Sequence, residues 1–221
     1  MTFKPRINHP KYFFWILVLF IWIVSTVADR IWWNFFSNTP SWDQADYLNS
    51  ALDHAQALSF LGGDGSVDFD SLLDKSPKIP PLASIVNGAV ISFAGDAPHS
   101  AAWSLSLWNG FLIFNIASWG LYLRGKKFAL FCVLISAFSP FLFHLRTDYV
   151  LELPLISAIT FYLFYLGKWS DYGNGSKWIQ LIIASISCAS SLLIKQSSLL
   201  VIIPSFLFVF VLSFKRDNKF R

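Results

Sequence analysis

Apolar runs with at most one charged residue alternate with short charged clusters along most of this chain. These runs cover residues 12–28, 101–123, 128–143, 149–167 and 178–214. The last run has 37 residues, and as one helix it would measure about 55 Å against a hydrocarbon core of about 30 Å. It must therefore fold back on itself, and Lys195 to Ser198 is the natural turn. The pattern predicts an all-α integral membrane protein with about six transmembrane helices.

The first apolar run, residues 12–28, follows three bases at Lys4, Arg6 and Lys11. A basic flank and an apolar run are shared by signal peptides and by first transmembrane helices. This run is longer and more aromatic than a usual signal core, which favours an uncleaved helix. The preceding bases place the N-terminus in the cytoplasm.

Residues 29–100 form the one long polar segment, which this topology makes a large first extracytoplasmic loop. The uncharged run 79–95 inside it decides the sidedness of all that follows. If that run crossed the membrane, five of the 17 Lys and Arg would lie inside and twelve outside; if it lies on the outer face, the numbers are reversed. The positive-inside rule prefers the second arrangement. We therefore expect interfacial helices in the loop, and a multi-pass protein of the inner or plasma membrane with both termini in the cytoplasm.

Composition agrees with this topology and excludes other classes. The 221 residues are 55% hydrophobic and only 14% charged, too apolar for a soluble domain of this size. The net charge of +4 is unevenly spread, because residues 29–96 carry nine acids against three bases. Such segregation reflects loop sidedness and argues against nucleic-acid binding. Cys132 and Cys188 both lie inside apolar runs, so no disulfide or metal motif is indicated.

Two carboxylates stand at the start of the loop, in the stretch 40–52. If a helix begins after Ser41, a good N-cap residue, Asp43 and Asp46 are three apart and share a face. On the residues alone, an amphipathic surface helix with acids in its first turn explains this stretch equally well.

A resemblance to known enzymes favours a functional role for this stretch over a plain surface helix. The letters W-D-Q-A-D-Y-L at residues 42–48 resemble the D-E-x-x-Y-type signature in the first extracytoplasmic loop of GT-C glycosyltransferases, which use polyprenyl-phosphate-linked sugars. Protein O-mannosyltransferases and aminoarabinose transferases are examples. The resemblance implies that Asp43 is the catalytic aspartate and that Tyr47 is the signature tyrosine. Gln44 stands where the family usually has glutamate.

A second element of the same family follows the acidic motif. Lys78-Ile79-Pro80-Pro81-Leu82 resembles the family's K-P-P-L, with Ile79 inserted, and the resemblance implies that Lys78 lies near the lipid phosphate. The alternative is a proline-rich loop with a solvated lysine.

Charged residues near the ends of the later runs complete the pattern. Arg146 and Asp148, followed by L-E-L-P-L, loosely resemble the family's acid and proline before a membrane helix. Asp148 and Glu152 are expected on one helix face, four apart. Glu152 therefore needs another partner, and Arg146 is the nearest base in sequence. A purely structural ion pair of Arg146 with an acid is as good an interpretation as a catalytic role.

Lys195 resembles the lysine of the family's T-K-x-x element, and the alternative is a snorkelling lysine.

The resemblance implies an inverting glycosyltransferase that transfers a sugar from a polyprenyl-phosphate donor to an acceptor hydroxyl on the extracytoplasmic face. Asp43 would be the general base. Asp46, Tyr47 and Glu152 would orient the acceptor or a divalent cation, the one cofactor expected. The lipid phosphate would be bound by basic residues, namely Lys78, Arg146 and Lys195. The partners implied are the polyprenyl-phosphate sugar and the lipid bilayer.

Domain organisation follows from the same resemblance. Residues 1–221 would be the N-terminal transmembrane part of a GT-C-like domain, with the acidic motif in the loop 29–100. Because members of the family are usually longer, the chain would be a truncated enzyme, a half whose C-terminal part is supplied by a second chain, or an inactive remnant. The alternative function is a non-catalytic lipid-carrier-binding or assembly subunit, or a small transporter. Transporters more often place ionisable groups near the membrane midplane, whereas the polar groups here collect at one side.

Overall fold

The computed structural model describes residues 11–36, 41–58, 67, 70, 80–95, 98–171 and 177–217. Every regular element that it assigns in these residues is a helix, which confirms the all-α class. In chain order the helices are α1 (Lys11–Phe35), α2 (Trp42–Ala57), α4 (Pro81–Ala94), α5 (Pro98–Ala101), α6 (Trp103–Arg124), α7 (Lys126–Ala137), α8 (Pro140–Thr147), α9 (Glu152–Asp171), α10 (Lys177–Leu192), the short 3₁₀ helix η1 (Gln196–Ser198) and α11 (Leu199–Asp217).

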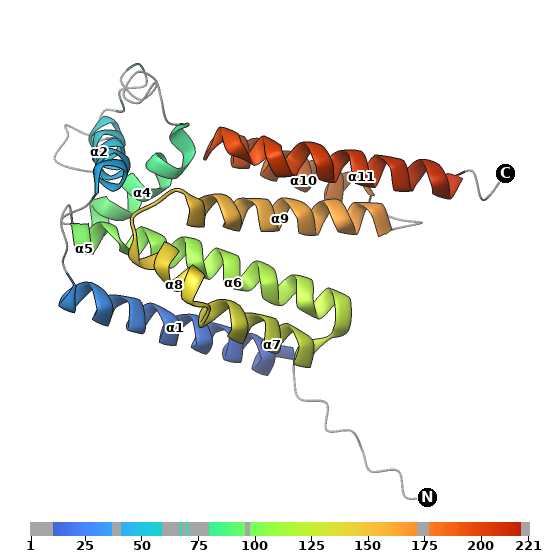
Figure 1. Cartoon of the computed structure of the whole chain (residues 1–221), viewed down its shortest axis with the longest axis horizontal. Helices are drawn as coiled ribbons and strands as arrows, with labels where there is room; N and C mark the ends of the chain where they lie inside the picture. The colour runs from blue at the N-terminus through green and yellow to red at the C-terminus, as the bar shows by residue number, and fades with distance from the viewer. Residues whose placement is uncertain are drawn as a thin grey trace, which may run out of the picture.

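The long helices run side by side along the molecule, and α2, α4 and α5 lie together at one end of them (Figure 1). α6 occupies the middle of the bundle, with α1 and α7 against one side and α9 against the other. α10 and α11 both pack on α9. The chain turns back between α10 and α11 at Lys195, next to η1, as the length of the last apolar run predicts.

The central position of α6 explains why its sequence is not uniformly apolar. Ser104, Asn109 and Asn115 are buried in the bundle, where polar side chains find protein partners instead of lipid. The Asn109 side-chain amide donates to Ser25 Oγ on α1 at 3.2 Å. Large apolar side chains on α1, α7, α10 and α11 are exposed instead, as on a surface that faces lipid.

α2 and α4 pack closely across the end of the bundle. Gly88 allows the approach, because a Cβ at this position would lie 2.6 Å from the Ala51 carbonyl oxygen. Beside it, the hydroxyl of Ser50 donates to that of Ser84 at 3.0 Å. α4 has 14 residues, about 21 Å of helix. It is shorter than a bilayer core of about 30 Å, but so is α10 with 16 residues, and the interfacial position of α4 stays a prediction.

The expected number of spans is only partly supported. Among the described residues, one helix is long and apolar enough to cross a membrane by itself, Tyr12–Phe35. A second span results if Lys126–Ala137 and Pro140–Thr147 are counted together, with a bend of 55° between them. The remaining four expected spans stay predictions.

Two expected helix boundaries are wrong. The run 128–143 is not one straight helix, because Phe138 ends α7 and Pro140, which has no N–H to continue the ladder, starts α8. The next helix begins at Glu152, not at Tyr149, and Asp148 is the C-cap of α8. Asp148 and Glu152 therefore do not share a helix face.

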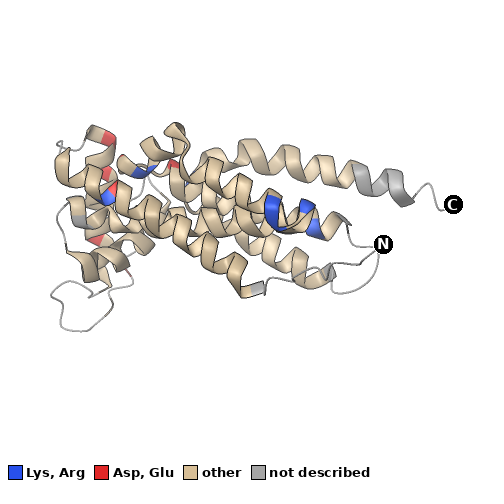
Figure 2. Cartoon of the chain, turned by 90° about the horizontal axis from the view of Figure 1, so that it is seen from below, with Lys and Arg blue, Asp and Glu red and all other residues tan. Residues whose placement is uncertain are grey.

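Acidic residues gather at the end of the molecule where α2 and α4 lie, whereas basic residues occur at both ends (Figure 2). Arg124 ends α6 and Lys126 starts α7, so these bases lie at the end opposite α2. The sidedness that the sequence predicts from these bases stays a prediction.

Candidate active site

The acidic motif forms the first turns of α2, as its residues predict. Ser41 is the N-cap, and its backbone N–H donates to Gln44 Oε1 at 3.0 Å in a capping box. Gln44 thus serves the cap in the place where the family usually has glutamate. Asp43 and Asp46 are exposed to solvent, whereas Tyr47 is half-buried. One turn of helix therefore presents two carboxylates outward and a phenol toward the bundle.

The side chain of Tyr47 brings the acidic motif close to two segments from much later in the chain. It packs against a buried cluster that includes Leu151, just before α9, and Ile194, just before the Lys195 turn. Burial raises the pKa of Tyr47, the positive charge of Lys195 opposes that rise, and the negative charge of Glu152 adds to it. Segments separated by more than a hundred residues thus meet at the phenol.

Lys195 and Glu152 form an ion pair at this meeting point. Glu152 is the first residue of α9, and Lys195 is the extended residue that precedes η1. Burial by itself would lower the pKa of Lys195, but its hydrogen bond to Glu152 and the nearby negative charges raise it. One of those charges is Asp43. We name Asp43, Tyr47, Glu152 and Lys195 the polar cluster.

The proline element lies against the same place. Pro81 starts α4, and the backbone N–H of Leu82 donates to the carbonyl oxygen of Leu193 at 3.0 Å. The start of α4 is therefore tied to the turn that carries Lys195. Lys78 itself lies outside the described residues, so its predicted contact with the lipid phosphate stays a prediction.

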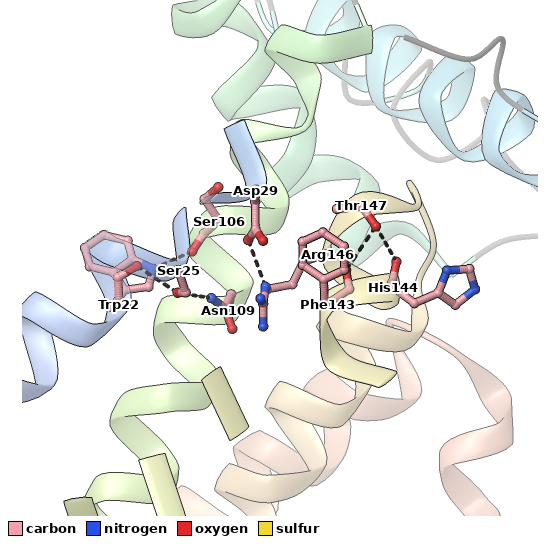
Figure 3. A network of polar contacts seen from close by, with 9 residues as sticks. All are labelled: Trp22, Ser25, Asp29, Ser106, Asn109, Phe143, His144, Arg146 and Thr147. Atoms are coloured by element: carbon pink, nitrogen blue, oxygen red, sulfur yellow. Dashed lines mark hydrogen bonds and ion pairs between the residues drawn. The ribbon is translucent and has the colours of Figure 1, made fainter. Parts of the chain in front are cut away.

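Arg146 is not in contact with the polar cluster. Its Nε donates to Asp29 Oδ2 at 2.8 Å, and both side chains are almost fully buried, 3% and 1% exposed. The guanidinium also lies 5.8 Å from the centre of the Phe143 ring. The pair joins α8 to α1, beside the Ser25–Asn109 hydrogen bond that joins α1 to α6 (Figure 3). Of the two interpretations left open for Arg146, this geometry favours the structural ion pair.

The sequence suggested a pair between Arg146 and Glu152, and the structure contains two other pairs instead. Arg146 is the nearest base to Glu152 in sequence, yet Glu152 pairs with Lys195, 43 residues later. A signal for this pair was present, because Glu152 and Lys195 are the single charges of their apolar runs and fall at the same expected end. Asp29 was counted among the loop acids, although its place at the end of the first apolar run marks a buried position.

The cluster has the groups for an acid–base reaction beside an anion. An exposed carboxylate at Asp43 can accept a proton, and the ammonium of Lys195 can stabilise a developing negative charge. Within the described residues, no three His, Cys, Asp or Glu side chains are arranged to hold a metal ion. The roles of Asp46, Tyr47 and Glu152 in orienting the acceptor or a divalent cation stay predictions.

These observations define a class: an all-helical membrane protein with a polar cluster at one end of its bundle. The sequence profile of the dolichyl-phosphate-mannose-protein mannosyltransferase family matches residues 75–221, about two thirds of the chain. The chain belongs to this family, and the predicted resemblance to GT-C type glycosyltransferases is confirmed. No curated protein and no solved structure matches the chain significantly.

The family match covers some residues of the polar cluster and not others. It includes the proline element, Glu152 and Lys195, whereas Asp43 and Tyr47 precede its first residue. Family membership makes the chain a membrane glycosyltransferase of the mannosyltransferase type. The roles of α2 and of its carboxylates rest on the motif and on the geometry above.

Proposed function

We propose that the chain is the N-terminal transmembrane part of an inverting glycosyltransferase that uses a polyprenyl-phosphate sugar as donor. The acceptor is a hydroxyl on the extracytoplasmic face, where residues 29–100 form the loop with the acidic motif. One observation carries this proposal: the acidic motif of α2 meets the ion pair of Glu152 and Lys195, next to the start of α4.

In this reaction Asp43 takes the proton of the acceptor hydroxyl as its oxygen attacks the anomeric carbon from the side opposite the phosphate. The bond from that carbon to the phosphate oxygen breaks, and its electron pair leaves with the polyprenyl phosphate. Lys195, with Lys78, stabilises the negative charge that develops on this leaving group. The configuration at the anomeric carbon is inverted by the single displacement.

The other cluster residues have positioning roles. Glu152 holds the Lys195 ammonium at the end of the bundle, and Tyr47 of α2 lies near this pair. Asp46, exposed on the same helix, orients the acceptor. Arg146 acts at a distance from the donor by fixing α8 on α1.

The membrane arrangement belongs to the same proposal. Six passes through α1, α6, the bent α7–α8 pair, α9, α10 and α11 would place the polar cluster outside and both termini in the cytoplasm. The bases at the α6–α7 turn support this sidedness.

The test is transfer of mannose from a polyprenyl-phosphate donor to peptides that contain Ser and Thr, with purified protein in detergent. The wild type is compared with Asp43→Asn and with Asp53→Asn, a matched acid on the same helix. Transfer that is lost only in Asp43→Asn supports the reaction and the base. Retention of the lipid phosphate without transfer by any of the three proteins would instead favour the lipid-carrier-binding subunit.

A further inference from the structure

Asp43 and Lys195 belong to two separate parts of the fold. Asp43 is on α2, which packs closely on α4 at Gly88. Lys195 pairs with Glu152, the first residue of α9. α4 and α9 in turn both pack on α6. The separation between the carboxylate of Asp43 and the ammonium of Lys195 therefore depends on how α4 and α9 are fixed to α6.

Trp108 of α6 is hydrogen-bonded to both of these helices. Its indole N–H donates to Asn87 Oδ1 on α4 at 2.9 Å. Its backbone carbonyl oxygen accepts from the Ser157 hydroxyl on α9, also at 2.9 Å. Asn87 and Ser157 are 2% and 0% exposed, so both hydrogen bonds are shielded from water and are stronger than they would be at a surface. One residue of α6 thus holds α4 and α9.

The ring of Trp108 also supports the segments that carry the ion pair. It packs against the buried cluster that includes Leu151 and Ile194, the residues that directly precede the two members of that pair. Tyr47 of α2 packs against the same cluster. The indole therefore lies in the part of the core that joins the acidic motif to the Glu152–Lys195 pair.

Two hydrogen bonds along α4 set the direction of this helix. The bond from Leu82 N–H to the Leu193 carbonyl oxygen fixes its start beside the turn between α10 and η1. Asn87 lies five residues further on, about 7.5 Å along the helix axis, and there Trp108 holds it. With the first bond alone, α4 could pivot about its start. α2 and Asp43 would move with it, because α2 packs on α4.

We infer that Trp108 is a positioning residue of the transfer reaction, which sets the separation between the Asp43 carboxylate and the Lys195 ammonium. It does so through its hydrogen bond to Asn87, and not by contact with a substrate. Its role in transfer rests on the function proposed above for the polar cluster. Base and ammonium must act on the two sides of one reacting carbon at the same time. A change in their separation therefore slows the reaction more than it weakens the binding of either substrate.

The test compares three variants of the full chain with the wild type, purified in detergent. Trp108→Phe keeps an aromatic ring and the backbone bond to Ser157, and removes the N–H that Asn87 accepts. The double variant Trp108→Phe with Asn87→Leu also removes the buried acceptor that the single variant leaves unpaired. Trp22→Phe is the matched control, because it removes an indole hydrogen bond of the same 2.9 Å length, from α1 to the Ser106 carbonyl oxygen of α6.

Three quantities are measured on each protein. The first is kcat and KM for transfer of mannose from a polyprenyl-phosphate donor to peptides that contain Ser and Thr. The second is stability, by titration with a denaturing detergent. The third is the distance between spin labels at Gln56→Cys on α2 and Leu200→Cys at the start of α11, two exposed positions, by pulsed electron paramagnetic resonance with Cys132→Ala and Cys188→Ala. The distance needs no substrate, so it is informative even if the wild type transfers no mannose.

We expect Trp108→Phe to lower kcat about tenfold or more, with the KM of the donor within about twofold of wild type. The double variant should unfold at nearly the wild-type detergent concentration and yet keep the low kcat, because the bond between α4 and α6 is still absent. The distance distribution should shift or broaden in both. Trp22→Phe should lose stability as Trp108→Phe does, and keep the wild-type kcat and distance.

Three results would overturn the positioning role of Trp108. A kcat that returns with stability in the double variant would show that Trp108 acts through stability alone. An unchanged distance in both Trp108 variants would show that other contacts fix α4. An equal fall of kcat in Trp22→Phe would show that the loss of any indole hydrogen bond slows transfer. A wild type that transfers no mannose, with a distance that shifts only in the Trp108 variants, would instead refute the proposed function and support the positioning of α2 by Trp108.

Discussion

The Arg146–Asp29 pair gives the sharpest prediction on stability. The side chains are 3% and 1% exposed, so replacement of Arg146 by methionine leaves a carboxylate buried without its partner. Breaking a buried pair in this way typically costs about 3–5 kcal/mol. We therefore expect a loss of about 4 kcal/mol.

The assay is the free energy of unfolding of the purified protein in mixed micelles, measured by titration with a denaturing detergent. The double variant Asp29→Asn with Arg146→Met removes both charges and is the control, because pairs replaced by neutral groups often lose little stability. The double variant should therefore recover most of the stability that Arg146→Met loses.

Two results would refute this reasoning. A loss below about 1 kcal/mol in Arg146→Met would match an exposed pair and not a buried one. A double variant no more stable than the single one would show that the loss comes from packing around Arg146, and not from the unpaired charge.

Three further predictions concern the polar cluster and its support. Glu152→Gln should cost less than about 1 kcal/mol of stability, because both partners are partly exposed, yet transfer should fall about 100-fold, as expected when Lys195 loses its orientation. The stability difference between wild type and Glu152→Gln should be constant from pH 7 to 9. It should vanish as the pH rises above about 10.4 through the raised pKa of Lys195, read from unfolding curves at each pH. Gly88→Ala should destabilise the fold by about 1–3 kcal/mol, because its Cβ would press on the Ala51 carbonyl. Gly167→Ala, with nothing within 4 Å, should be neutral or stabilising in the same titration with a denaturing detergent.

Local signals in the sequence were sufficient for the elements that carry the site. Ser41 and the acids after it predicted the start of α2, because a cap depends on groups three residues apart. The length of the last apolar run predicted the turn at Lys195. The bend at Pro140 could have been predicted in the same way, since proline cannot continue the ladder of hydrogen bonds. The run 128–143 was instead expected as one helix because it contains no charged residue.

Contacts between elements could not be derived in the same way. Arg146 finds Asp29 across 117 residues, and Glu152 finds Lys195 across 43. Each choice depends on which helix ends meet, and that is set by packing around α6. Sequence distance pointed to Arg146 as the partner of Glu152, because proximity along the chain is the only distance that a sequence contains.

The different exposure of the two ion pairs indicates which of them can take part in the reaction. The Arg146–Asp29 pair is sealed from solvent, so an incoming phosphate would have to break it at a cost of several kcal/mol. The Lys195–Glu152 pair is 31% and 40% exposed and is worth about 1 kcal/mol at most. The phosphate carries one negative charge in the donor and two once its bond to the sugar has broken, and it can share the Lys195 ammonium with Glu152 without loss of the fold. Lys195 is held in place before the donor arrives and stays available to it, which is the combination that a group stabilising the departing lipid phosphate requires.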